Sequence, residues 1–311
     1  METGNKTEVM EFVLLGLSQT HEVQLFLFFL FLLFYVIVLP GNILIILTVR
    51  RDPQLDSPMY FFLAHLAFLD ICYCSITPPK MLADFFSQRK TISSRSCIAQ
   101  LFFLHFLGGA EIFLLIAMAF DRYVAICKPL HYATLMKKMV CWILVVAAWA
   151  GGFTHSLIQV AFVVHLPFCG PNELDNFFCD VTQVIKLACT NTYVLEFIIF
   201  VNSGLVILIC FILLLLSYGV LVIRLKTGIS KGKRKAVSTC ITHIIIVFVM
   251  FGPAMYIYCR PFCSLPLDKV VAVFHTVVFP LMNPMIYTLR NREILGAMKQ
   301  LLARCCLGRG N

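Results

Sequence analysis

Hydrophobic residues in this 311-residue chain gather into long uninterrupted stretches instead of alternating with polar residues. Each stretch is bounded by charged residues or by Pro, Gly and Asn, and seven of them occur: 24–49, 58–80, 97–120, 139–165, 194–224, 236–259 and 270–289. A helix needs about 20 residues to cross the hydrocarbon core of a bilayer. A membrane β-barrel would instead show alternating strands of about 10 residues. The pattern therefore predicts an all-α membrane protein, a bundle of seven transmembrane helices.

The composition excludes soluble and disordered classes. Hydrophobic residues make up 60% of the chain and charged residues 13%, and the mean hydropathy is +0.90. An ordinary soluble domain is about 25% charged, and a disordered chain combines low hydrophobicity with high charge. Both classes are therefore incompatible with this composition.

The positions of Lys and Arg predict the orientation of the bundle. Seventeen of the 25 Lys and Arg residues lie in 50–57, 122–138, 224–235 and the tail after 289. Cytoplasmic loops are enriched in these residues, so the N-terminus is expected outside the cell and the C-terminus in the cytoplasm. The same distribution accounts for the net charge of +9. Because these Lys and Arg residues are spread over several short loops, no nucleic-acid partner is predicted.

This topology divides the chain into three parts: an extracellular N-terminus over 1–24, the seven-helix domain over 25–289, and a cytoplasmic tail over 290–311 with a short amphipathic eighth helix. Asn5 begins an Asn-Lys-Thr triplet, an N-glycosylation acceptor on the expected outer side. Cys305 and Cys306 follow the amphipathic segment and are candidates for palmitoylation.

Four cysteines lie at the outer end of the third span and in the long outer loop after the fourth. Cys97 opens the third span, and Cys169, Cys179 and Cys189 lie in the long loop over 166–193. Disulfides form in the extracellular compartment. Four cysteines permit three pairings, and the sequence alone does not choose between them.

Two carboxylates fall inside predicted spans, Asp70 in the second and Glu111 in the third. An ionisable group at membrane depth costs about 2.5–3.5 kcal/mol or more. Two carboxylates at similar depth repel if both are ionised, so either one holds a proton or a cation such as sodium lies between them. The plainer interpretation is a pair of internally hydrogen-bonded acids that fix helix packing.

His105 also lies within a span and shares a helix face with Gly108. The pair Gly108-Gly109 leaves open space beside that face, or else allows close helix packing. Tyr258 lies at the outer end of the sixth span, where aromatic side chains commonly anchor helices at the interface. No hydrolase motif, phosphate loop or paired Cys-x-x-Cys metal site is present, so an enzyme is not predicted.

Two motifs lie at the cytoplasmic ends of spans. Asp121-Arg122-Tyr123 closes the third span, and Pro284 breaks the seventh helix next to Asn283. Seven spans with these motifs resemble the rhodopsin-like G-protein-coupled receptors. Further runs resemble the signatures of vertebrate olfactory receptors and follow the order of that family over nearly the whole chain: Pro58–Leu63, Met118–Leu130, Ser217-Tyr218, Lys235–Cys240 and Pro280–Asn291.

The resemblance implies disulfides Cys97–Cys179 and Cys169–Cys189, and a sodium site at Asp70 and Glu111. It implies no other cofactor. Residues that rearrange on activation would be Asp121, Arg122, Tyr123, Tyr218, Asn283, Pro284 and Tyr287. The implied odorant pocket would be lined by His105, Gly108, Gly109, Asn202, Ser203, Val206, Phe251, Met255, Tyr258 and Thr276.

The same resemblance implies a multi-pass protein of the plasma membrane, in contact with lipid. Its partners would be a small volatile odorant and the olfactory stimulatory heterotrimeric G protein, which raises cyclic AMP. Amine receptors carry an acid where Leu104 stands, so a cationic amine is not an expected ligand. Met250-Phe251-Gly252 stands where family members often have Phe-Tyr-Gly, which removes one hydroxyl from the pocket floor.

Two alternatives remain open. A channel or transporter would use Asp70 and Glu111 as an ion relay, but transporters often show repeated halves, and this sequence shows none. A chemosensory receptor outside the nose has the same sequence features as an odorant receptor. Transcript location, not sequence, separates these two roles.

Overall fold

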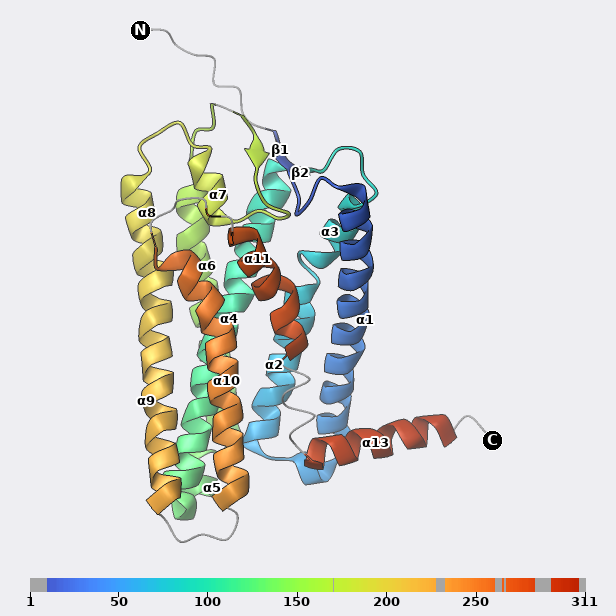
Figure 1. The fold of residues 1–311 in the computed structure, drawn as a ribbon. Helices are drawn as coiled ribbons and strands as arrows, with labels where there is room; N and C mark the ends of the chain where they lie inside the picture. Colours follow the sequence, from blue (N-terminus) through green and yellow to red (C-terminus); the bar gives the residue numbers. More distant parts are fainter. Residues whose placement is uncertain are drawn as a thin grey trace.

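The computed structural model describes residues 10–169, 171–227, 233–260, 265, 267–282 and 292–307. Long helices run side by side along one axis, and α13 lies across one end of them (Figure 1). The longer helices are α1 His21–Arg51, α2 Pro58–Cys74, α4 Ser94–Cys127, α6 Lys138–Val163, α9 Val206–Thr227, α10 Lys233–Tyr258 and α13 Arg292–Leu307. The shorter helices are α3 Pro78–Asp84, α5 Tyr132–Leu135, α7 Val181–Lys186, α8 Tyr193–Ile199 and α11 Asp268–Val273.

Five segments of the described residues are long and apolar enough to cross a membrane: His21–Arg51, Pro58–Asp84, Ser94–Cys127, Lys138–Val163 and Tyr193–Leu225. They coincide with the first five predicted spans. The sixth predicted span lies in α10, whose described apolar part, His243–Tyr258, is shorter. The seventh begins with α11 and is described as far as Met282, so the rest of it lies outside the described residues.

The second span is interrupted near its outer end, which the sequence pattern did not indicate. Helix α2 ends at Cys74, and Ser75 closes it with a hydrogen bond from its Oγ to the Ile71 carbonyl at 2.7 Å. Pro78 and Pro79 have no N–H to continue the α2 ladder. They fit instead in the first turn of α3, where the N–H groups have no helical partner.

A small sheet lies at the end of the bundle opposite α13 (Figure 1), a feature that the prediction of an all-α bundle did not include. Strand β1, Glu11–Leu14, is central; it pairs antiparallel with β2, Thr91–Ser93, and parallel with β3, Glu173–Leu174. The strands have four, three and two residues. Such short runs carry too few alternating positions for a period of two to stand out.

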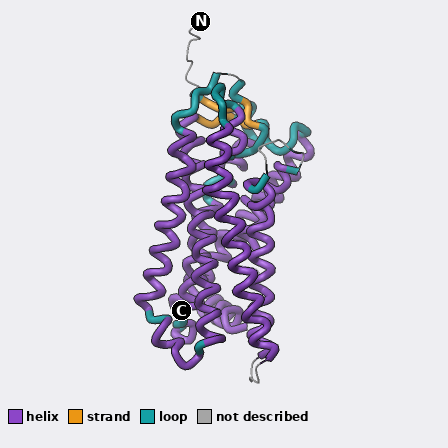
Figure 2. The backbone as a smooth tube through the Cα atoms, turned by 90° about the vertical axis from the view of Figure 1, so that its left-hand side faces the viewer, coloured by secondary structure: helices purple, strands orange, loops and turns teal. Residues whose placement is uncertain are grey.

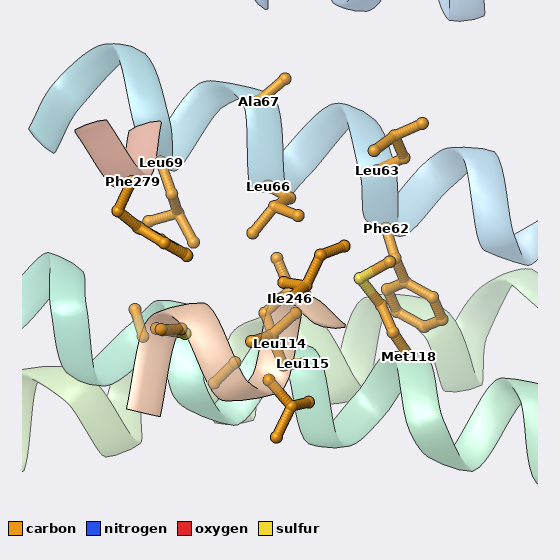
Figure 3. Close-up of a cluster of buried hydrophobic side chains, with 14 of the residues drawn as sticks. Phe62, Leu63, Leu66, Ala67, Leu69, Leu114, Leu115, Met118, Ile246 and Phe279 are labelled. Carbon is orange, nitrogen blue, oxygen red and sulfur yellow. The ribbon is translucent and has the colours of Figure 1, made fainter. Parts of the chain in front are cut away.

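Figure 2 shows the long helices of the bundle from a second side, and the buried apolar side chains of the core come from these helices. In Figure 3, side chains from α2 and α4 meet Ile246 of α10 and Phe279. The α2 and α4 side chains labelled there are Phe62, Leu63, Leu66, Ala67, Leu69, Leu114, Leu115 and Met118. The outer surface is also apolar, with exposed side chains such as Phe26, Ile143 and Leu216. A surface of this kind fits lipid instead of water.

Helices α4 and α6 approach each other closely at Gly152. A Cβ at this position would lie 2.5 Å from both the Phe106 carbonyl oxygen and the Ala110 nitrogen. Only a residue without a side chain fits there, as is common at contacts between membrane helices. The backbone of α4 is thus held against α6 halfway along its length.

We expect Gly152→Ala to lower the melting temperature of the purified protein. The added methyl group meets backbone atoms that cannot rotate away, and overpacking of this kind costs about 1–3 kcal/mol. Gly219→Ala is the matched control, because no heavy atom lies within 4 Å of its added Cβ. Equal melting temperatures for the two variants would contradict the close approach.

Candidate ligand-binding site

A cavity of about 80 Å³ lies between the helices in the half of the bundle nearer the sheet. It has room for roughly half a dozen waters or a ligand with a similar number of heavy atoms. Most of the lining is apolar with a few polar groups, as is usual for small-molecule sites. The lining residues are Tyr73, Leu104, His105, Gly108, Gly109, Glu111, Ile112, Phe113, His155, Phe178, Cys179, Asp180, Ser203, Val206, Ile207, Met250, Phe251, Ala254, Ile257, Tyr258, Ala272, His275, Thr276 and Phe279.

The structure brings most of the predicted pocket residues to this cavity: His105, Gly108, Gly109, Ser203, Val206, Phe251, Tyr258 and Thr276. Asn202 and Met255 are not among the lining residues. The Asn202 amide donates to the His155 carbonyl at 3.2 Å, which ties it to α6. Met255 packs against the apolar core.

The cavity also contains polar residues that the sequence did not assign to it: Tyr73, His155, Asp180 and His275. His275 lies in a π-helical turn, η4, Phe274–Val278. A second π-helical turn, η3, Phe200–Leu205, carries Ser203. One extra residue in a turn rotates the following side chains to another face, so a regular helical period does not place them. Such turns are frequent at functional sites.

The loop before α7 forms the roof of the cavity and is fixed to α4. Cys97 and Cys179 form one disulfide and Cys169 and Cys189 a second, which are the pairings that the resemblance implied. The Cys179 backbone N–H also donates to Gln100 Oε1 at 2.8 Å. These two links place the next residue, Asp180, at the cavity.

Asp180 is the acid of the roof and is 9% exposed. Burial raises the pKa of its carboxyl group above the ordinary value, opposed by a hydrogen bond from Thr182 and by the electrostatic influence of His105. The sequence analysis found no acid at the Leu104 position and expected no cationic amine for that reason. The loop supplies an acid after all, but its surroundings disfavour the ionised form.

Two tyrosine–histidine hydrogen bonds lie at the cavity. The Tyr258 hydroxyl is 3.3 Å from His105 Nε2, and the Tyr73 hydroxyl is 3.1 Å from His275 Nδ1. Tyr258 therefore faces inward. Its contacts are those of a cavity residue and not of an aromatic side chain that anchors a helix at the membrane interface. The end of α10 lies close to η3 here, because a Cβ at Gly204 would be 2.4 Å from the Tyr258 carbonyl oxygen.

The two buried carboxylates lie on adjacent helices, Asp70 on α2 and Glu111 on α4, at 1% and 3% exposure. Glu111 lines the cavity and Asp70 does not. Carboxylate oxygens are the donors that hard cations prefer. Among the residues described, no group of three or more His, Cys, Asp or Glu side chains is arranged to hold a metal ion, so any cation there would need further oxygen ligands.

The half of the bundle nearer α13 holds the predicted switch residues that the structure describes. Arg122 donates through Nε and Nη2 to Asp121 at 3.1 and 2.8 Å, and the Tyr132 hydroxyl donates to the same carboxylate at 2.7 Å. The Tyr218 hydroxyl lies 2.7 Å from His243 Nδ1 and joins α9 to α10. Tyr123 is 38% exposed. Four predicted residues lie outside the described part of the chain: Asn5, Asn283, Pro284 and Tyr287.

Helix α13 follows the transmembrane part, in the region where an amphipathic segment was expected. Its Ile294 and Ala297 are buried, while Lys299 and Gln300 on another face are exposed. The Tyr60 hydroxyl of α2 donates to Glu293 Oε2 at 2.5 Å. These contacts hold the start of α13 against the end of the bundle.

A bundle of apolar helices with a cavity at one end and an Asp-Arg-Tyr motif at the other has the features of a G-protein-coupled receptor. Comparison with known proteins supports this class. The model of the family described as "Olfactory receptor" matches residues 31–305. Olfactory receptor 4M1 of Mus musculus is 62% identical over 306 residues, 98% of this chain and 98% of that protein. Olfactory receptor 4N5 of Homo sapiens is 60% identical over 304 residues, 98% of this chain and 99% of that protein.

This chain belongs to the olfactory receptor family. Its relatives are receptors and not enzymes, and they imply a bundle of seven transmembrane helices in a multi-pass membrane protein. The family also makes the channel or transporter alternative unnecessary.

The buried carboxyl of Asp180 predicts a specific pH dependence of stability. Because its pKa is raised in the folded protein, the native state keeps a proton that the unfolded chain releases. Stability is therefore lost as pH rises from the ordinary Asp value, about 3.9, through the raised native value. Asp180→Asn should remove this loss, so its melting temperature relative to the unmodified protein should increase between pH 4 and pH 7.

Glu173→Gln is the control, because Glu173 belongs to the same loop and is exposed. It should show no comparable trend with pH. A constant difference between the Asp180→Asn variant and the unmodified protein over this range would contradict the raised pKa.

Proposed function

We propose that this protein binds small volatile organic molecules in the cavity and activates a stimulatory heterotrimeric G protein, which raises cyclic AMP. One observation carries the proposal: a mostly apolar cavity, roofed by a disulfide-linked loop, in a member of the olfactory receptor family. The apolar part of a guest would pack against Val206, Ile207 and Phe251, and Ser203 or Tyr258 would orient its polar group.

Helix α10 offers a route from the cavity to the cytoplasmic half. Phe251 and Tyr258 of this helix line the cavity, and His243 of the same helix bonds Tyr218 of α9. A guest shifts the equilibrium only if it binds the active packing more tightly than the inactive one. Repacking around Phe251 would move α10, weaken the Tyr218–His243 contact and free the cytoplasmic end of the helix for the G protein.

The proposed location is the plasma membrane, with the N-terminus outside and α13 on the cytoplasmic side. The excess of Lys and Arg in the loops at one end supports this orientation. The sheet and both disulfides lie near the opposite end, and disulfides persist in an oxidising compartment. The apolar outer surface would contact lipid.

Filling the cavity should weaken the response to odorants. We expect a screen of volatile compounds in transfected cells to identify agonists that raise cyclic AMP without an ionic current of the receptor itself. Gly108→Phe should then lower agonist potency at least tenfold, because a Cβ at Gly108 meets only Tyr73, at 3.9 Å, and the ring extends into free space. Gly219→Phe lies outside the cavity lining and should leave the potency unchanged. An unchanged response of the Gly108→Phe variant would place the ligand elsewhere.

A sodium ion at Asp70 and Glu111 is the second part of the proposal. Their buried carboxylates supply oxygen ligands of the right kind, and a cation would relieve the repulsion between them. We expect a higher melting temperature in sodium chloride than in choline chloride at equal ionic strength. Asp70→Asn and Glu111→Gln should each remove the difference. Asp56→Asn, at an exposed ion pair, should retain it. A difference that persists in the first two variants would exclude this site.

A further inference from the structure

The proton positions around His105 follow from its two hydrogen bonds. His105 Nδ1 lies 2.9 Å from the Leu101 carbonyl oxygen. A carbonyl oxygen only accepts, so Nδ1 carries a proton. In a neutral ring Nε2 is then an acceptor, and the Tyr258 hydroxyl, 3.3 Å away, donates to it.

The surroundings of His105 favour the neutral ring. The residue is 9% exposed, and burying a charge is costly without a partner of opposite charge. The acid that faces it is Asp180, and burial favours the protonated form of that carboxyl by raising its pKa. The His155 ring, 6.0 Å away between centroids, would add repulsion if both rings were charged. The hydroxyl of Tyr258 is thus committed as a donor to His105.

As a result, Tyr258 presents only oxygen lone pairs to a guest. Thr276 behaves in the same way, because its hydroxyl donates to the Ala272 carbonyl at 2.7 Å. The Tyr73–His275 pair differs, since whichever tautomer is present leaves one of its protons available. A guest that only accepts hydrogen bonds can therefore use that pair, but it loses the contact with Tyr258.

We propose that Tyr258 acts as a hydrogen-bond acceptor in the cavity, so that this receptor prefers small alcohols over the aldehydes or ketones of the same carbon skeleton. The proposal rests on the proposed function above, because it names the ligand class of the same cavity. The cavity volume of about 80 Å³ limits the guest to a small molecule.

The test compares two guests on one receptor. Cyclohexanol with cyclohexanone and 1-hexanol with hexanal are suitable pairs, as is the alcohol–carbonyl pair on the skeleton of any agonist that the screen finds. The readout is the ratio of half-maximal concentrations in the cyclic AMP assay, which does not depend on how much of each variant reaches the cell surface. The alcohol should be about three- to tenfold more potent in the unmodified receptor, the effect of one hydrogen bond.

Three variants test whether the preference for alcohols comes from the hydrogen bond to Tyr258 or only from packing in the cavity. Tyr258→Phe removes the acceptor, so both members of a pair should become about equally potent. His105→Phe removes the partner of the Tyr258 proton, so Tyr258 can donate to a carbonyl and the preference should shrink or reverse. Tyr193→Phe is the matched control, because this tyrosine is 78% exposed, and it should keep the preference. If His105→Phe does not fold, the Tyr258→Phe ratio decides.

A receptor that responds to carbonyl compounds as well as or better than to their alcohols would overturn the proposal and leave the proposed function standing. Asp180→Asn distinguishes the cause. If Asp180 and His105 formed an ion pair, the charged ring would donate to the Tyr258 oxygen, and Tyr258 could donate its own proton to the guest. Asp180→Asn would then make His105 neutral and shift the ratio of potencies toward the alcohol. We expect an unchanged ratio. The absence of any response to a wide panel would instead reject the proposed function itself.

Discussion

Lipid offers no hydrogen-bond partner, and this constraint governs polar groups throughout the molecule. Backbone groups meet it by forming helices. Interior polar side chains meet it by pairing across helices: Tyr258 with His105, Tyr73 with His275, and Tyr218 with His243. Each pair joins two different helical segments. The same bonds that remove the cost of buried polar groups therefore determine which helices are linked.

Two of these pairs lie at the cavity and one lies in the half of the bundle nearer α13. Helix α10 takes part in one pair of each kind, through Tyr258 and His243. Helix α4 contributes His105 at the cavity and the Asp121–Arg122 pair at its other end. A guest that binds to the Tyr258 hydroxyl thus acts on a helix that is also held near the opposite end of the bundle. This arrangement suits a receptor, in which binding and response lie apart.

The sequence was sufficient for the parts of the molecule that follow a regular period. The first five spans coincide with observed helices, and the positions along α4 that face the cavity, such as His105 and Gly108, follow helical spacing. The rest depends on departures from that spacing. His275 lies in a π-helical turn, and Asp180 reaches the cavity only because a disulfide fixes its loop to α4. No local pattern encodes a contact between residues 82 positions apart.

The sheet above the cavity has a consequence for biosynthesis. Its central strand, β1, is made first, but the partners β2 and β3 follow about 80 and 160 residues later in the chain. During synthesis the strand must wait without either neighbour while several helices are inserted. Pairings so distant in sequence form late. The sheet can therefore close only after α1, α2, α4 and α6 have been made, and a nascent chain stalled before residue 173 would expose an incompletely paired strand to quality control.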